Sequence, residues 1–410
     1  MHCKALQFII TIILLIMKCL LCHNDTAVEF LDLGNQPLAN KYPTESEFAT
    51  EDFFPLNIFF CSTCKNVQLG RIVSRERMFV DYYYLSSVNG ALVRHFEEFA
   101  EQIKDAKFVI DIGSNDGILL KPLKERGVKA IGVEPSVNVS KIANDAGLET
   151  ITSFFDTKTV KKIVAEHGQS DMVVTSSVFT HVEDPHQIIE DIKKLMTDDG
   201  AFIIEVEHIG AFVANTQFER FYFDRPYYYS ATSLRDLFAL HNMYIADIEH
   251  ITPHGGSIRV TTHKNGHTAP ETERFLALLK EEEGTLTSET MEDFRKTSES
   301  YVQAFKDKLI AYKEEGLCVA GYSAPARVST ICNFGNIGPD LIEFLVDDSP
   351  LKQNRTSPGT HIPIVPKEYL DEKGADILVV FAYEYLDDIR AKTIGKNYRY
   401  LIPIPPKEVV

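Results

Sequence analysis

The clearest pattern of apolar and polar positions lies in one stretch of the first half of the chain. Residues 108–112 are apolar or β-branched apart from one acid, which predicts a short buried strand. A glycine-containing turn at 113–117 follows, and residues 118–126 have helical spacing. Residues 128–133 predict a second strand that ends at Glu134. Strand, turn, helix, strand and acid open a doubly wound nucleotide-binding sheet, whose ligand lies at the carboxyl ends of the strands.

The residues of this turn indicate the class of ligand. The sequence Asp-Ile-Gly-Ser-Asn-Asp-Gly has two glycines and two acids in place of the Gly-x-Gly-x-x-Gly of dinucleotide folds. Acids repel a pyrophosphate and suit a cation that carries an amino acid group. The turn resembles the first motif of class I S-adenosylmethionine methyltransferases; a strand–turn–helix without a ligand is the alternative. The resemblance assigns to the methyl donor Asp111, Gly113, Ser114, Asn115, Gly117, Glu134 (on both ribose hydroxyls), Pro135 and Ser177.

The same alternation continues after this stretch. Residues 172–176 and 201–206 predict further strands, and Asp198-Asp199-Gly200 is a turn signal before the second of them. A final strand of the core is expected over 258–262. Between these strands a helix is predicted with Leu234, Leu237, Phe238 and Leu240 on one face.

A second α/β pattern occupies the end of the chain. Residues 268–315 are charged and glycine-poor, which predicts amphipathic helices that bridge two lobes. Strands are expected near 317–321, over 342–346 and over 377–381. The turn Gly-Tyr-Ser-Ala-Pro-Ala lacks the full dinucleotide fingerprint, so we expect no nicotinamide cofactor.

Composition limits the classes of function. The chain has 410 residues with 44% hydrophobic and 10% aromatic content, enough for two or three domains with real cores. The formal net charge is -17 with no block of basic residues, which argues against a nucleic-acid partner.

Two Cys-x-x-Cys pairs near the N-terminus have the spacing of a metal site. Cys19 with Cys22 and Cys61 with Cys64 predict a closed, structural Cys₄ zinc site. Two redox pairs, or disulfides in an exported chain, are the alternatives.

The N-terminal residues 6–16 form an apolar run that is too short to span a bilayer. The run resembles a signal-peptide core, but no Ala-x-Ala-like cleavage site follows. A thiolate zinc site does not suit an oxidising compartment. We therefore expect a cytoplasmic protein without a stable membrane span; Met17 as the working start is one explanation of the run.

Several motifs together identify a family. Leu-Gly-Asn-Gln-Pro-Leu-Ala-Asn at 33–40, Tyr-x-Tyr-x-Ser-Ser at 82–87, Pro-His-Gly-Gly-x-x-Arg at 253–259 and Val-Asp-Asp-x-Pro-x-Lys-Gln at 346–353 resemble sugar-nucleotide C-methyltransferases, which add branching methyl groups to deoxysugars. The resemblance implies an α/β fold with a class I methyltransferase core between a small zinc domain and a Rossmann-like C-terminal domain. The expected divisions are an N-terminal extension (1–16), zinc domain (17–80), methyltransferase domain (81–265), helical linker (266–315) and substrate-binding α/β domain (316–410).

The chain departs from this family where the base is expected. In the family a histidine ends a Tyr/Phe-x-Glu-His loop and removes a proton next to the ketone of a nucleotide-linked sugar. Here the loop is Tyr222-Phe223-Asp224-Arg225, and a guanidinium is no base at neutral pH. Either another side chain removes the proton, or Arg225 binds an anion while O or N is methylated, or catalysis is lost. The catalytic candidates are His181, Tyr222, Asp224, Arg225, His208 and Tyr84.

The acceptor is expected to be a small nucleotide sugar bound by a monomer. Its candidate contacts are His254, Gly255, Arg259, Lys352 and Arg355. A nicotinamide-dependent sugar reductase and a non-catalytic protein that keeps the donor pocket are the competing functions.

Overall fold

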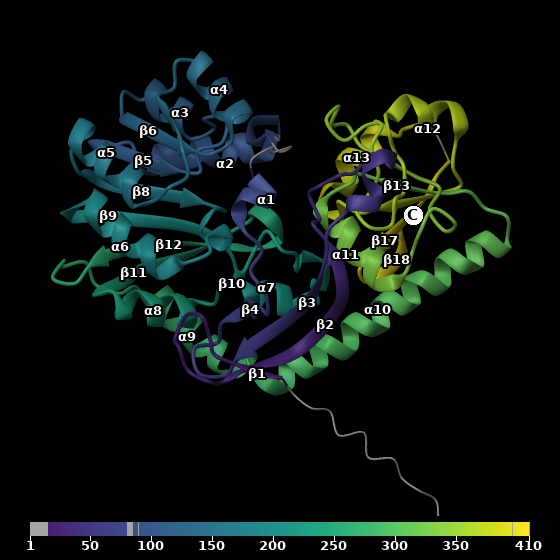
Figure 1. Cartoon of the computed structure of the whole chain (residues 1–410), viewed down its shortest axis with the longest axis horizontal. Coiled ribbons are helices and arrows are strands. Elements are labelled where there is room, and N and C mark those ends of the chain that lie inside the picture. Colours follow the sequence, from purple (N-terminus) through teal and green to yellow (C-terminus); the bar gives the residue numbers. More distant parts are fainter. Residues whose placement is uncertain (1–14, 80–84, 89, 396, 410) are drawn as a thin grey trace, which may run out of the picture.

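The computed structural model describes residues 15–79, 85–88, 90–395 and 397–409, which form three β-sheets (Figure 1). The candidate Tyr84 and residues 1–14 of the N-terminal extension lie outside the described residues. None of the helices in the described part of the chain has the length and apolar character that a membrane crossing requires.

The N-terminal sheet is antiparallel and carries the cysteine pairs at the turns of its hairpins. Its long strands β2 and β3 curve from the methyltransferase core toward the C-terminal lobe in Figure 1. The fifth strand, β10, comes from far along the chain and pairs with β4, so this sheet is tied to the next domain. Its elements are β1 (Ile16–Met17), β2 (Ala27–Pro37), β3 (Phe53–Cys61), β4 (Val67–Leu69) and β10 (Tyr227–Tyr228), with the short helices η1 (Glu45–Thr50) and α1 (Arg75–Phe79).

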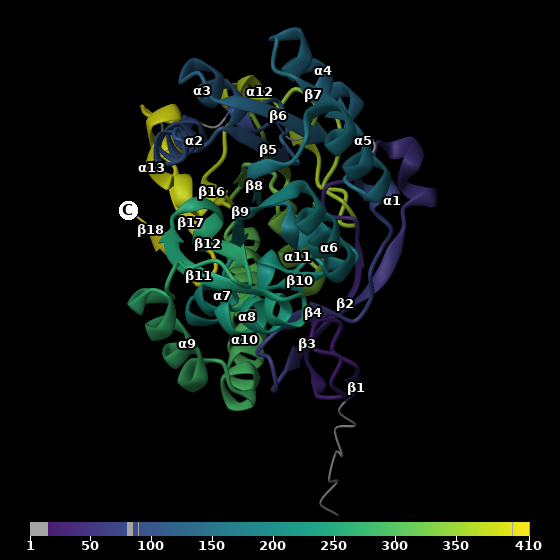
Figure 2. The same ribbon diagram turned by 90° about the vertical axis from the view of Figure 1, so that its left-hand side faces the viewer.

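The central sheet has seven strands in the order β11-β12-β9-β8-β5-β6-β7, and Figure 2 shows them from β7 near the top to β11 below. The strands from β7 to β9 are parallel, and β12 and β11 are antiparallel. The order reverses between β5 and β8, where a doubly wound sheet binds its ligand. The strands are β5 (Phe108–Ile112), β6 (Lys129–Glu134), β7 (Thr150–Thr152), β8 (Ser170–Ser176), β9 (Met196–Glu207), β11 (Met243–Ile251) and β12 (Ser257–Lys264).

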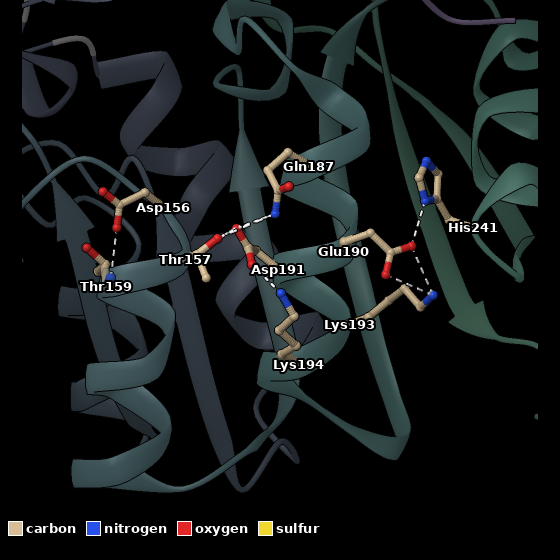
Figure 3. A network of polar contacts seen from close by, with 9 residues as sticks. All are labelled: Asp156, Thr157, Thr159, Gln187, Glu190, Asp191, Lys193, Lys194 and His241. Atoms are coloured by element: carbon tan, nitrogen blue, oxygen red, sulfur yellow. Dashed lines mark hydrogen bonds and ion pairs between the residues drawn. The ribbon is translucent and has the colours of Figure 1, made fainter.

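Helices cover both faces of this sheet. Helices α5 and α6 lie side by side and are joined by polar contacts (Figure 3): the buried Asp191 accepts hydrogen bonds from Thr157 (2.7 Å) and Gln187 (3.1 Å) and pairs with Lys194. The helices are η2 (Ser86–Val88), α2 (Gly90–Gln102), α3 (Leu120–Glu125), α4 (Val137–Asp145), α5 (Thr157–His167), η3 (Phe179–His181), α6 (Pro185–Leu195), α7 (Ile209–Ala214), η4 (Phe218–Arg220), α8 (Ala231–Leu240) and η5 (Pro253–Gly255).

Two helices, α9 (Glu273–Thr285) and the long α10 (Ser288–Glu314), lead to the C-terminal lobe (Figure 1). This lobe has a six-stranded sheet in the order β15-β14-β13-β16-β17-β18, parallel except for β18. Its elements are β13 (Val319–Tyr322), α11 (Ala326–Gly335), β14 (Phe344–Val346), β15 (Ile364–Val365), α12 (Lys367–Lys373), β16 (Ile377–Val380), η6 (Tyr383–Tyr385), α13 (Leu386–Lys392), β17 (Arg399–Pro403) and β18 (Pro406–Val409).

Two local predictions are wrong. Asp198, Asp199 and Gly200 lie inside β9, where the pairing register with β8 shifts, and do not form a separate turn. Leu240 at the end of α8 is 58% exposed, whereas Leu234, Leu237 and Phe238 are buried as expected. Gly and Asp favour bulges as well as turns, so the sequence signal did not separate the two.

Candidate active site

At two positions of the turn after β5, glycine fits and a residue with a Cβ does not. Gly113 has a φ of +73°, and a Cβ there would lie 2.3 Å from Val178 Cγ2. Gly117 has a φ of +86°, and a Cβ there would lie 2.4 Å from Leu148 Cδ1. Both glycines therefore allow a tight turn that larger residues would open.

The acid at the end of β6 holds this turn in place. Glu134 Oε2 accepts a hydrogen bond from the backbone N–H of Asn115 (3.1 Å), and its Oε1 accepts one from the N–H of Ser136 (2.8 Å), the residue after Pro135. Glu134 is 5% exposed, and burial raises the pKa of its carboxyl above the ordinary value. Each carboxylate oxygen has a second lone pair, so the group can still accept a diol.

Further polar groups gather at the carboxyl ends of β5 and β8. Among the described residues, the buried hydroxyls of Ser114, Thr175 and Ser176 have no hydrogen-bond partner. Ser177, with a φ of +56°, follows Ser176. Burial, then the charges of Glu134 and Glu205, raise the pKa of Asp111 to about 7. Unsatisfied buried groups are costly, so this end of the sheet is built to receive a polar ligand.

A second cluster lies where the loop after β8 meets the loop before β10. It contains His181, Tyr222, Asp224 and Arg225, four of the sequence candidates, together with Glu207 from the end of β9. Sequence reasoning missed Glu207, although an acid at the carboxyl end of a predicted strand was a visible signal.

The ring of His181 is oriented by the main chain. Its Nδ1–H donates a hydrogen bond to the carbonyl oxygen of Asp224. This hydrogen bond places the basic lone pair on Nε2. Burial, then the positive charge of Arg225, lower the pKa of His181 below its usual value. A neutral imidazole with a fixed tautomer is able to accept a proton.

Arg225 is 6% exposed and lies opposite the fully buried Glu207, with 2.6 Å between Nη2 and Oε1. Its guanidinium also lies 5.0 Å from the ring centre of Tyr222. Among the described residues, its Nε and Nη1 donate no hydrogen bond. Arg225 therefore keeps donors for an anionic or carbonyl oxygen.

His208 lies next to Glu207 in the chain, but successive strand residues point to opposite faces. Its Nε2 lies 2.8 Å from Glu282 Oε1, and Glu282 also accepts the backbone N–H groups of Ala231 and Thr232. The structure thus joins His208 to the start of α8 and to α9, and does not bring it to the His181 cluster.

The Gly-Gly motif before β12 packs against an arginine. A Cβ on Gly255 would lie 2.4 Å from Arg220 Nη2, so the motif makes room for that guanidinium. The buried Arg259 forms an ion pair with Glu205, with 2.6 Å between Nη2 and Oε1. Its guanidinium carbon lies 4.1 Å from the ring centre of Phe99. For His254, only the backbone position in η5 is described.

The C-terminal lobe repeats the acid-and-turn arrangement of the central sheet. Asp347, at the end of β14, accepts the N–H of Ala324 (2.8 Å) and of Ser349 (2.9 Å), as Glu134 does in its own sheet. Lys352 Nζ forms an ion pair with Asp347 Oδ2 at 3.3 Å. Arg355 Nη1 donates a hydrogen bond of 2.8 Å to the carbonyl oxygen of Tyr42. These two basic residues therefore contact groups of the protein itself.

The four cysteines of the N-terminal sheet come together. Cys19 Sγ and Cys64 Sγ are 3.7 Å apart, Cys22 Sγ and Cys61 Sγ are 3.6 Å apart, and all four sulfurs lie within 4.8 Å of one another. Zinc–sulfur bonds of about 2.3 Å place tetrahedral sulfurs about 3.8 Å apart. The cluster fits a structural zinc ion.

Three family models match successive parts of the chain: "Putative zinc binding domain" (residues 19–79), "Methyltransferase domain" (84–247) and "C-methyltransferase C-terminal domain" (252–405). The C-methyltransferase NovU of Streptomyces niveus is 27% identical over 405 residues, with 96% of each chain covered. The chain belongs to the C-methyltransferase family.

Two further similarities of this C-methyltransferase cover part of the chain. The mitochondrial ubiquinone biosynthesis O-methyltransferase of Arabidopsis thaliana is 28% identical over 126 residues, which are 29% of this chain and 39% of that protein. The solved magnesium protoporphyrin IX methyltransferase of Synechocystis PCC 6803 is 16% identical, with 43% of this chain and 82% of that chain covered and a TM-score of 0.32.

The C-methyltransferase uses S-adenosylmethionine as its methyl donor, and its N-terminal domain binds zinc. Both cofactors agree with the residues present: an acid, a glycine turn and unsatisfied hydroxyls for the donor, and four convergent thiols for the metal. The predicted fold class, family and cofactors are confirmed. The roles of the individual site residues remain predictions.

Proposed function

We propose that this C-methyltransferase methylates the carbon next to the ketone of a nucleotide-linked sugar through an enolate. The observation that carries the proposal is the buried cluster of His181 and Arg225, which combines a neutral imidazole with guanidinium donors. The sequence motifs that resemble sugar-nucleotide C-methyltransferases support the choice of acceptor. Removal of a carbon-bound proton needs both a base and a group that stabilises the developing oxyanion.

His181 is the base in this mechanism. The carbonyl of Asp224 holds the Nδ1 proton, so the Nε2 lone pair takes the proton next to the ketone. The low pKa of the buried imidazole keeps it in the basic form at neutral pH. Tyr84, which lies outside the described residues, is proposed from the sequence motif to contact the sugar.

Arg225 stabilises the enolate oxygen. Its Nε and Nη1 donors act in a water-poor site, where charge stabilisation is strong. Glu207 keeps the guanidinium oriented, and the Tyr222 hydroxyl is a further donor. Arginine thus supplies the oxyanion contact at the position where the family has its base.

The methyl donor and the nucleotide of the acceptor bind at separate places. S-adenosylmethionine supplies an electrophilic methyl group, and Glu134 and the turn 113–117 fix its nucleoside. We assign the nucleotide diphosphate to Arg355 and Lys352, and the sugar side to the η5 loop with Arg259. A diphosphate would compete with Asp347 for Lys352.

The test uses the full chain and a panel of nucleotide-linked ketosugars. In D₂O without the methyl donor, NMR should show exchange of the proton next to the ketone; with donor, the product should gain one methyl group on that carbon. His181→Gln should abolish exchange, whereas His250→Gln, an exposed histidine of β11, should retain it. No exchange and no methylation with any acceptor would refute the proposal.

One observation favours O-methylation as a second candidate. Arg225 occupies the family's base position, and methylation of oxygen needs no carbon-bound proton to be removed. A product with the methyl group on oxygen, formed without deuterium exchange, would establish this alternative in place of the first.

A further inference from the structure

The segment between the two cysteine pairs contacts both larger domains. After β2, residues 38–43 pass between the methyltransferase core and the C-terminal lobe, and Leu38 and Tyr42 are buried in the core that these parts share. Within this segment the Tyr42 hydroxyl donates to the carbonyl of Ala324 in the C-terminal lobe (2.8 Å). The zinc-binding domain is therefore anchored at the edge of the candidate active site.

Asn40, in the middle of the segment, contacts the acceptor cluster directly. Its Nδ2 donates a hydrogen bond of 2.7 Å to Asp224 Oδ2, across 184 positions of the chain. Asp224 is 3% exposed, so its carboxylate is largely shielded from water. A hydrogen bond to a buried charge is among the stronger ones in proteins.

Asp224 uses its side chain and its main chain for different partners. The carboxylate accepts from Asn40, and the carbonyl oxygen accepts from Nδ1 of His181. Rotation of the Asp224 peptide would remove the carbonyl from Nδ1, and the imidazole would then be able to take the other tautomer. The two contacts therefore form one chain from the zinc-binding domain to the candidate base.

We infer that Asn40 is a positioning residue, through which the zinc-binding domain fixes Asp224 and thereby the tautomer and direction of the His181 ring. The inference rests on the proposed role of His181. It gives the N-terminal domain a part in catalysis besides folding. Tyr42 holds the same segment against the C-terminal lobe, so all three domains meet at this point.

Two substitutions test the inference. Asn40→Ala removes the donor and should slow α-proton exchange and methyl transfer by about 10- to 100-fold, with unchanged affinity for S-adenosylmethionine. Asn40→Asp places two carboxylates together; once protonated, the new acid can donate to Asp224 again. The activity of Asn40→Asp relative to wild type should therefore rise as the pH falls, whereas that of Asn40→Ala should stay level.

A spectroscopic measurement is independent of any acceptor. With ¹⁵N-labelled histidine, NMR of the full-length protein should show the Nδ1–H tautomer for His181 in wild type and a mixture of tautomers in Asn40→Ala; His181→Gln assigns the signal. Asn57→Ala, in strand β3 of the same domain, is the matched control and should leave the tautomer unchanged.

The outcomes separate this inference from the proposed function. A His181 tautomer that is the same in Asn40→Ala and wild type would overturn the role of Asn40, even if methyl transfer is observed. A tautomer that shifts, in a protein that methylates no ketosugar, would support Asn40 as a positioning residue and refute the proposed substrate.

Discussion

Glu207 Oε1 lies 2.6 Å from Arg225 Nη2, and both side chains are buried. The pair forms because the last residue of β9 and the turn before β10 meet beside the loop that carries His181. It neutralises a cation at the position where the family places its base. In the proposed mechanism, the guanidinium therefore acts as a hydrogen-bond donor, and His181 is the group that accepts a proton.

The first prediction concerns this ion pair. Arg225→Met leaves the buried Glu207 carboxylate without its guanidinium, which should lower the free energy of unfolding by about 3–5 kcal/mol. The double substitution Arg225→Met with Glu207→Met should recover most of that loss. Urea unfolding followed by circular dichroism measures both. Equal stability of the single and double variants would show that the pair does not couple the two residues.

The second prediction concerns the methyl-donor pocket. Glu134→Ala removes the proposed ribose acceptor and the two backbone contacts that hold the turn at Asn115 and Ser136. The affinity for S-adenosylmethionine should fall by about 10- to 100-fold, as measured by isothermal titration calorimetry. Glu125→Ala, an exposed acid at the end of α3, is the control and should bind as wild type does. Undiminished binding by Glu134→Ala would remove the ribose assignment.

The third prediction is a pH dependence of donor binding. Burial and the nearby carboxylates raise the pKa of Asp111 to about 7, so the group is largely neutral below that pH. The donor is a cation and prefers the ionised carboxylate, so binding releases a proton. Affinity should rise up to about tenfold per pH unit below pH 7 and become constant above it.

Calorimetry in two buffers of different ionisation enthalpy counts the released proton, and Asp111→Asn should make the affinity independent of pH. The pH dependence of folding stability has the opposite sign to that of donor affinity. A carboxyl pKa raised from 3.8 to about 7 gives the ligand-free protein stability at low pH that is lost as the pH rises through 7. A donor affinity that does not change between pH 6 and 8 would contradict both statements.

The fourth prediction concerns the metal. Elemental analysis should find one zinc ion per chain, and Cys64→Ser should lose the metal and much of the N-terminal sheet, because a structural zinc contributes roughly 10–16 kcal/mol of apparent binding energy. Cys318→Ser in the C-terminal lobe should retain the zinc. Full retention of zinc by Cys64→Ser would show that this thiol is not a ligand.

Local sequence was sufficient to predict which residues of the proposed methyl-donor pocket lie together. The strand, the glycine turn and the acid at Glu134 follow one another within one βαβ unit, so their spacing already fixes which groups meet. The zinc site was equally predictable from the two cysteine pairs, because zinc geometry constrains their spacing. Where a pattern had two structural solutions, as at Asp198 to Gly200, the sequence signal gave the wrong one.

The arrangement of the residues proposed to bind the acceptor was decided by the tertiary structure. Arg225 was visible in the sequence as a departure from the family, but its partner Glu207 depends on how β9 ends against the turn before β10. The separation of His208 from His181 depends on the alternation of side chains along a strand.

The sequence by itself predicted the glycine turn with its acid and the convergence of the four cysteines, because those contacts form between residues close in the chain or related by a short, stereotyped motif. Only the tertiary structure decided that Asn40 of the zinc-binding domain donates a hydrogen bond to Asp224, and that Lys352 forms an ion pair with Asp347. These pairings depend on how separately formed sheets pack together, and no spacing along the chain records that packing.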